Sequence, residues 1–256
     1  MMQIKILGCS GGIGGELRTT AMLTDDDILI DAGSGVGDLS MDALLKIDHI
    51  FITHSHLDHI AFIPFLLDTV MGIRAEPVTV HASKETLAIL RNHIFNWKVW
   101  PDFNAIPSAE APFLRYNEIK LGETITLQGR KITALPANHV VPAVGYQLDS
   151  GVASLVFTGD TTSCDALWVA VNKINNLKYL IIETAFRNNE FELAKLSKHL
   201  CPSLLEAELG KLSLKNIEVY ITHLKPGEGE TIMHEIAESN LGISIQALKN
   251  QQVFNL

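Results

Sequence analysis

Short apolar runs bounded by Gly, Pro and Asp recur along the chain, and each has the length and pattern of a buried β-strand. Between several of them lie segments whose apolar residues recur every three or four positions, which predicts helices packed on a core. Strands are expected over 3–7, 20–23, 27–31, 49–53, 78–81, 130–136, 143–148, 154–158, 179–183 and 218–222, the last clear one. Helices are expected over 39–45, 60–71, 84–93, 165–174, 202–212 and 233–239, and Ser83 is placed to cap the third.

The two kinds of element are mixed in both halves of the chain. This order is typical of an α/β protein in which two sheets pack together and helices cover their outer faces. No low-complexity segment, repeat or convincing linker divides the sequence, and 47% of its 256 residues are hydrophobic, with a mean hydropathy of +0.19. We therefore expect a single domain over residues 1–256 with a large core.

Charge and cysteine content exclude several classes of function. The formal net charge is −9, so the protein is a poor candidate for gripping long nucleic acid through its phosphates. No apolar run approaches the ~20 residues of a membrane span, and residues 1–5 do not resemble the start of a signal peptide. The three cysteines are far apart and odd in number, which argues against a disulfide framework. We expect a cytoplasmic protein that contacts no membrane.

One short segment carries the strongest chemical signal. It reads His-Ser-His-Leu-Asp-His and directly follows an expected apolar strand. The alternation of His54 and His56 directs two imidazoles to the same side of an extended backbone, and Asp58 and His59 follow within reach of a second ion. Neutral imidazole nitrogens and carboxylate oxygens are ligands for zinc, iron and manganese. The segment therefore predicts a metal site.

A centre with two ions needs further ligands, and strand ends are where rigid elements hold them. His139, Asp160 and His223 each follow an expected strand. A lone histidine in such a place is usually an ordinary hydrogen-bonded residue, but the three together predict a binuclear site. Asp160 is the natural bridge, because its carboxylate offers one oxygen to each ion. The glycine-rich stretch 8–15 lacks a P-loop signature and predicts a tight turn that lets the backbone approach the site.

This ligand order resembles that of the metallo-β-lactamase superfamily, whose fold is an αβ/βα four-layer sandwich with the metals at one sheet edge. Within it, the chain is similar to the class II 3′,5′-cyclic-nucleotide phosphodiesterases from Leu7 to about Pro226. The similar segments are Thr-His-Ser-His-Leu-Asp-His-Ile at 53–60, His-Ile-Phe-Asn at 93–96, Trp-Pro-Asp at 100–102, Gly-Asp-Thr at 159–161, Glu-Thr-Ala-Phe at 183–186, His-Leu-Cys-Pro at 199–202 and Ile-Thr-His-Leu-Lys-Pro at 221–226. Lys198 and Cys201 stand where the family pattern has Gly and Thr, and the residues after Thr161 also depart from it. These departures put the contacts around the phosphate, and so the substrate preference, in question.

The resemblance implies how the ligands are shared. One divalent ion would be held by His54, His56 and His139, the second by Asp58, His59 and His223, with Asp160 bridging both. Zinc, manganese and iron all suit these ligands. Two ions about 3.5–4 Å apart activate water and clamp a phosphodiester.

The resemblance also implies catalytic and substrate-binding groups. His199 would protonate the leaving group and Glu183 would orient its imidazole, with Asp58 counted beside them as catalytic. Asn96 and Asp102 would contact the substrate, although packing of their loop explains that segment equally well.

The implied reaction is hydrolysis of a 3′,5′-cyclic nucleotide, cyclic AMP first, to a 5′-monophosphate, so the expected partner is a small nucleotide. One alternative is an RNA-processing phosphodiesterase similar to the tRNA 3′-end endonuclease. Such an enzyme should carry a basic, Gly/Pro-rich arm, which this sequence lacks. Another alternative is a redox protein of the same superfamily, which needs a flavin domain or a different ligand set. The resemblance also allows a homodimer, since relatives commonly dimerise.

Overall fold

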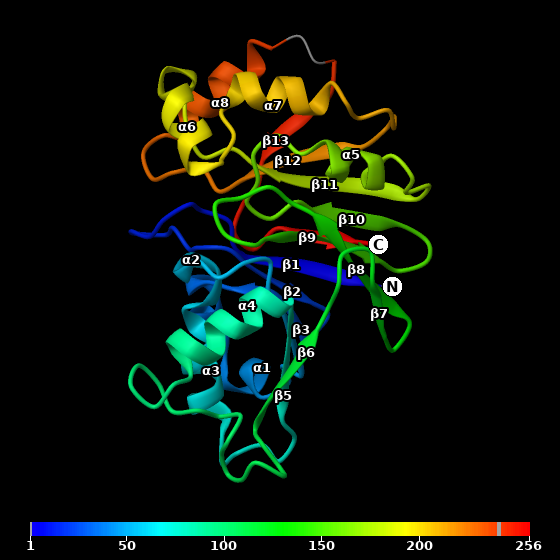
Figure 1. The fold of residues 1–256 in the computed structure, drawn as a ribbon. Coiled ribbons are helices and arrows are strands. Elements are labelled where there is room, and N and C mark those ends of the chain that lie inside the picture. The colour runs from blue at the N-terminus through cyan, green and yellow to red at the C-terminus, as the bar shows by residue number, and fades with distance from the viewer. Residues whose placement is uncertain (1, 240–241) are drawn as a thin grey trace.

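The computed structural model describes residues 2–239 and 242–256, and it arranges them as two seven-stranded sheets packed face to face (Figure 1). The first sheet has the order β14-β1-β2-β3-β4-β5-β6, with strands Val253–Asn255, Gln3–Gly8, Ala21–Thr24, Ile28–Ala32, His49–Phe51, Val78–Ala82 and Leu114–Glu118. The second has the order β13-β12-β11-β10-β9-β8-β7, with strands Ile245–Ala247, Glu218–Thr222, Leu177–Glu183, Ser154–Phe157, Val144–Asp149, Arg130–Pro136 and Thr124–Leu127. Strands β3 to β6 run parallel, as do β10 to β13.

Helices cover the outer face of each sheet (Figure 1). The first sheet carries α1 Met41–Leu44, α2 Leu57–Ile60, α3 Phe62–Val70 and α4 Lys84–Ile89. The second carries α5 Asp165–Val171, α6 Phe191–Ser197, α7 Pro202–Leu209 and α8 Gly229–Ala237. Three apolar clusters hold the layers together: one lies between the two sheets, and one lies under each set of helices. The α/β sandwich expected from the sequence is confirmed.

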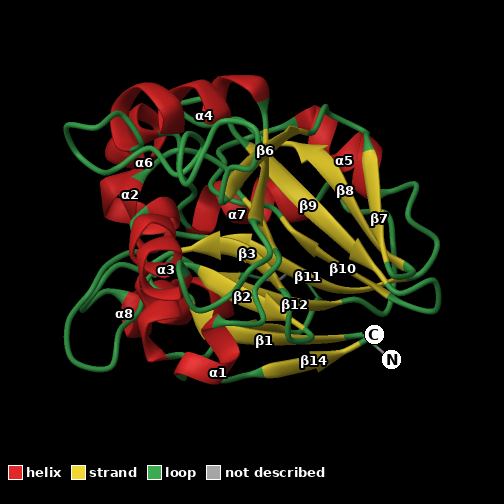
Figure 2. Ribbon diagram, turned by 90° about the horizontal axis from the view of Figure 1, so that it is seen from below, coloured by secondary structure: helices red, strands yellow, loops and turns green. Residues whose placement is uncertain are grey.

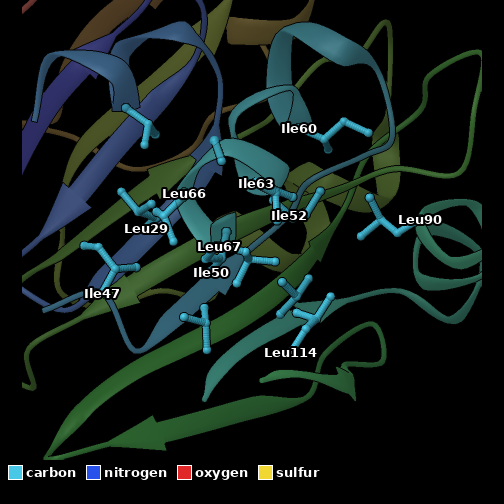
Figure 3. Packing of buried hydrophobic residues seen from close by; sticks show 14 of the residues in the cluster. Leu29, Ile47, Ile50, Ile52, Ile60, Ile63, Leu66, Leu67, Leu90 and Leu114 are labelled. Atoms are coloured by element: carbon cyan, nitrogen blue, oxygen red, sulfur yellow. The ribbon is translucent and has the colours of Figure 1, made fainter. Parts of the chain in front are cut away.

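Strand β3 shows why the apolar runs are continuous rather than alternating. Leu29 faces the helices, whereas Ile28 and Ile30 face the other sheet. Figure 3 shows Leu29 beside Leu66 of α3, with Ile50 of the neighbouring strand in the same cluster. Because both faces of the strand are covered, its successive positions 28–30 are all apolar, and only Asp31, next to the end, is polar.

The structure differs from the expected elements in several places. The interpretation of 218–222 as the last clear strand is wrong, because β13 and β14 follow it. The sequence patterns also do not predict β6, β7 or α6. Strands β6, β7, β13 and β14 are short and partly polar. They form by pairing with a neighbouring strand, as Val253 of β14 does with Lys5 of β1. The expected cap at Ser83 is confirmed, since its Oγ accepts a hydrogen bond from the Thr86 amide at 3.2 Å.

Strand direction brings the chemistry-bearing loops to one end of the sandwich. Strands β4, β10, β11 and β12 all finish at this end, and β8 also does so, because it is antiparallel to β9, which is antiparallel to β10. Helix α2 lies here, opposite the N- and C-termini (Figure 2). Of the helices in the described part of the chain, none has the length and apolar character needed to cross a bilayer.

Candidate metal centre

The seven side chains expected as metal ligands come from four loops at this end of the sandwich. Those at most 6% exposed are His54, His59, His139, Asp160 and His223. His56 and Asp58 are half-buried. Burial of so many polar groups in one place is costly unless something compensates it.

Their donor atoms form two groups that share one residue. The first group is His54, His56, His139 and Asp160, and the second is Asp58, His59, Asp160 and His223. Within each group the donor atoms lie within 4.8 Å of one another. Asp160 Oδ2 lies 3.6 Å from His54 Nε2 and 3.4 Å from His59 Nε2, so this carboxylate stands between the two groups.

Four buried atoms at the centre have no hydrogen-bond partner among the described residues: His54 Nε2, His59 Nε2, His223 Nδ1 and Asp160 Oδ2. An unpaired buried polar atom costs about 1–3 kcal/mol. The three ring nitrogens lie 3.4–3.6 Å from an Asp160 oxygen, which is longer than a normal hydrogen bond. Two ligands at about 2.0 Å from a tetrahedral cation are about 3.3 Å apart. The residues present therefore fit a divalent ion in each group.

In His59 and His139, the ring nitrogen Nδ1, on the other side of the ring from Nε2, is hydrogen-bonded to another part of the protein. His59 Nδ1 donates to Asp31 Oδ2 at 2.7 Å, and His139 Nδ1 donates to the Lys198 carbonyl at 3.0 Å. Such bonds fix the tautomer and orientation of the imidazole, leaving Nε2 as the lone-pair donor. The two rings are thus held in the orientation that ligation requires.

Asp31 is a functional residue that the sequence analysis missed. Its carboxylate is fully buried, and besides His59 it accepts bonds from the amide and hydroxyl of Thr53, each at 2.8 Å. Through Thr53 and His59 it supports both ends of the histidine-rich segment. The available signal was a carboxylate near the end of an otherwise apolar strand, since an aspartate is almost never fully buried unless it is paired.

Burial favours the neutral form of two of the expected ligands, which is the form that metal ligation requires. It lowers the pKa of His139 and that of His223 to about 4. His59 differs, because the carboxylates of Asp160 and Asp31 outweigh its burial and raise its pKa well above the ordinary value. A cation entering the second group would take the place of that proton.

The glycine-rich turn reaches the centre, as the sequence predicts. A Cβ at Gly11 would lie 2.6 Å from the carbonyl oxygen of His223 and 3.0 Å from its ring. The Gly11 amide donates to the Leu224 carbonyl at 3.0 Å. Because no larger residue fits, this glycine lets the first turn of the chain press against a ligand contributed more than 200 residues later.

Glu183 and His199 form a buried pair beside the second group. Glu183 Oε1 accepts from His199 Nδ1 at 2.7 Å and from the Thr161 amide at 3.1 Å, while Oε2 accepts from the Leu200 amide at 3.2 Å. The ring of His199 stacks on that of His223 with centroids 5.1 Å apart. Burial by itself would lower the pKa of His199, but the Glu183 carboxylate outweighs it and raises that pKa.

Asn96 and Asp102 make their side-chain hydrogen bonds to nearby backbone, and Asn96 Nδ2 donates to the Asn92 carbonyl at 3.0 Å. Asn96 Oδ1 accepts from the amides of Lys98 and Val99 at 3.0 and 2.9 Å, and Asp102 Oδ1 accepts from the Asn104 amide at 2.9 Å. Neither belongs to the two donor groups. These bonds give both residues a role in shaping the loop, and their contact with substrate stays a prediction.

Comparison with known proteins shows which proteins this chain is similar to. A family model described as Beta-lactamase superfamily domain matches residues 27–239. A probable 3′,5′-cyclic-nucleotide phosphodiesterase of Yersinia pestis is 29% identical over 205 residues, covering 71% of this chain and 58% of the relative. The 3′,5′-cyclic-nucleotide phosphodiesterase of Aliivibrio fischeri is 28% identical over 269 residues, covering 86% of this chain and 80% of the relative. A ribonuclease Z of Haloarcula marismortui is 29% identical over 156 residues, covering 58% and 47% respectively.

Two of these alignments thus span only about half the length of the relative. Among solved structures, unliganded yeast PDE1 superposes over 100% of this chain and 99% of its own, with a TM-score of 0.84 and 19% sequence identity. That likeness shows a shared fold.

Proposed function

This chain belongs to the β-lactamase superfamily, and on that premise we propose that it is a metal-dependent phosphoric diester hydrolase. The observation that carries the proposal is the position of Asp160, which two groups of ligand-type side chains share. Such an arrangement is what a two-metal hydrolase requires. The names of the relatives from Yersinia pestis, Aliivibrio fischeri and Haloarcula marismortui support phosphodiester chemistry.

The same residues that the sequence predicts would hold the ions. The first group would bind one divalent ion and the second group another, with zinc, manganese or iron suited to the imidazole and carboxylate donors. When bound, such ions lower the pKa of water and neutralise charge on a phosphate. Asp31 and the Lys198 carbonyl hold His59 and His139 in the required orientation.

His199 is the proposed proton donor to the leaving oxygen. Glu183 occupies its Nδ1, so Nε2 is the atom left to reach a substrate. The ring lies against His139 and His223, with centroids 4.9 and 5.1 Å away, which places it beside both donor groups. A leaving alkoxide needs a proton, and no other imidazole here is both near the centre and outside the two groups among the described residues.

The proposed substrate is a 3′,5′-cyclic nucleotide, with cyclic AMP first, and the product is a 5′-monophosphate. Two curated relatives carry that activity in their names. The ribonuclease Z relatives favour precursor tRNA as the second candidate. The net charge of −9 argues against that candidate, because tRNA binding relies on cationic contacts with phosphates.

One set of assays tests both candidates. Metal-loaded protein is incubated with cyclic AMP, cyclic GMP, bis-p-nitrophenyl phosphate and precursor tRNA, and its metal content is measured in parallel. We expect bound divalent ions, turnover of the generic diester and turnover of a cyclic nucleotide. Cleavage of the tRNA alone would replace the cyclic-nucleotide proposal, and a reconstituted protein that binds no ion would end the hydrolase proposal.

A further inference from the structure

A cavity of about 380 Å³ opens beside His139. Its lining includes Ser83, Glu85, Leu121, Asn138, His139 and Val140. The volume lies near the lower end of the ~300–1,000 Å³ usual for small-ligand pockets. His139 also belongs to the first donor group, so the cavity shares one residue with the metal centre.

Two sets of backbone contacts place the cavity next to the histidine-rich segment. Strands β4 and β5 are parallel neighbours with Phe51 paired to His81, so residues 54–56 and 83–85 leave the same sheet edge on adjacent strands. On the other side, the amide of Val144 donates to the Thr53 carbonyl at 3.0 Å. This bond ties the loop that forms one wall of the cavity to the start of the metal-binding segment.

The walls of the cavity offer exposed aliphatic side chains and one carboxylate, that of Glu85, which has no hydrogen-bond partner among the described residues. Leu121 and Val140 are 61% and 50% exposed, so each has surface available to a ligand. Asn138 is already engaged, since its Nδ2 donates to the Ser163 carbonyl at 2.9 Å and its Oδ1 accepts from Lys198 Nζ at 3.1 Å. The Glu85 carboxylate makes no hydrogen bond or ion pair with any residue in the ranges 2–239 and 242–256, and a carboxylate can only accept.

We propose that this cavity binds the nucleobase of the substrate, and that Glu85 selects bases carrying an exocyclic amino group. The inference rests on the proposed function, because it places the phosphate at the metal centre. With the phosphate there, the base extends sideways along the edge of the first sheet and packs between Leu121 and Val140. Glu85 is exposed, so an amino N–H can reach its carboxylate and donate to it. A base without that donor forms one hydrogen bond fewer and binds less tightly.

The test compares two substrates that differ only in the amino group: cyclic AMP and purine riboside 3′,5′-cyclic monophosphate. The wild-type protein should prefer cyclic AMP by about tenfold in kcat/KM. Glu85→Met should remove most of this preference through a higher KM for cyclic AMP, with kcat retained. Turnover of bis-p-nitrophenyl phosphate, which has no base, should not change.

Glu76 provides a matched control, because it is exposed and precedes β5 at the opposite end of that strand. Glu76→Met should keep the wild-type preference. An undiminished preference for cyclic AMP in Glu85→Met would overturn the assignment of Glu85.

A binding measurement separates this inference from the proposed function. Calorimetry compares 5′-AMP with purine riboside 5′-monophosphate on the wild-type protein and on Glu85→Met, without any turnover. Tighter binding of 5′-AMP that is lost in the variant supports the pocket even where cyclic nucleotides are not hydrolysed. Equal binding of both nucleotides by the wild-type protein would contradict it, even where hydrolysis occurs.

Discussion

His59 Nδ1 lies 2.7 Å from Asp31 Oδ2, and neither side chain is reached by solvent. The carboxylate is itself held by two bonds from Thr53. A proposed ligand is therefore positioned by a residue that lies outside both donor groups. Asp31 lies on β3, 28 positions before His59 of α2.

Replacing Asp31 should weaken metal binding without removing a ligand. Asp31→Asn keeps the size of the side chain but removes the negative charge that faces His59. We expect metal affinity to fall by about 10- to 100-fold, as for other residues that orient a metal-bound histidine. Competition with a chelating dye measures this, and Asp26→Asn, at an exposed aspartate, is the control. Unchanged affinity in Asp31→Asn would remove Asp31 from the site.

Substitutions at Asp160 and at His199 should have different effects, the first on ion binding and the second on proton transfer. Asp160→Asn should lose metal, because both donor groups use this carboxylate. His199→Ala should retain the metal and lose about 10²- to 10⁴-fold in turnover, the usual contribution of a general acid. Elemental analysis and steady-state kinetics on the same samples give both readouts. Full kcat in His199→Ala would show that another group supplies the proton.

Lys198 combines a strained backbone with two side-chain bonds. Its φ of 53° and ψ of 48° are left-handed, which costs about 1–2 kcal/mol for a residue with a Cβ. Its Nζ donates to Asn138 Oδ1 and to the His139 carbonyl, each at 3.1 Å. Lys198→Met keeps the strain and loses the bonds, so the free energy of unfolding should fall by about 1–2 kcal/mol.

Lys198→Gly is the matched comparison, because it loses the same bonds but also relieves the strain. We expect it to remain within about 1 kcal/mol of the wild type in urea denaturation at fixed metal content. Equal destabilisation by both substitutions would show that the left-handed backbone stores no strain at this position.

A histidine pair on neighbouring strands β4 and β5, with His81 buried and His49 half-buried, should make stability depend on pH. His81 Nε2 lies 3.0 Å from His49 Nδ1, and Asn117 donates to His81 Nδ1 at 2.9 Å. Burial and the neighbouring His49 lower the pKa of His81 to about 3 from an ordinary value of 6.5. Between these two values the unfolded chain binds a proton that the folded protein does not. Stability should therefore fall as the pH drops from 6.5 toward 3, by up to about 1.4 kcal/mol per pH unit.

Chemical denaturation at several pH values tests this dependence. His81→Gln keeps polar partners for its neighbours but cannot titrate, so its stability should decline less steeply with acid than that of the wild type. His234→Gln, at an exposed histidine of α8, should keep the wild-type slope. Identical slopes in His81→Gln and the wild type would show that His81 does not contribute.

Local sequence patterns were sufficient to predict much of the fold, because both faces of the central strands are covered. A strand such as β3 then begins with a continuous apolar run, and a polar residue, here Asp31, appears only near its end. The same rule located His139, Asp160 and His223, each of which follows a strand. By contrast, β14 could not be found locally, since it exists through pairing with β1 across almost the entire chain.

The sequence by itself determined the kind of protein: an α/β sandwich whose loops carry ligand-type histidines and aspartates in a recognisable order. Only the tertiary structure decided how these side chains meet, that Asp31 orients His59, that Asn96 and Asp102 bond to nearby backbone, and that Glu85 faces a cavity beside His139. Residue type and periodicity are local properties of a chain. Which strand ends share an edge, and which buried atoms lack a partner, depend on how distant segments pack.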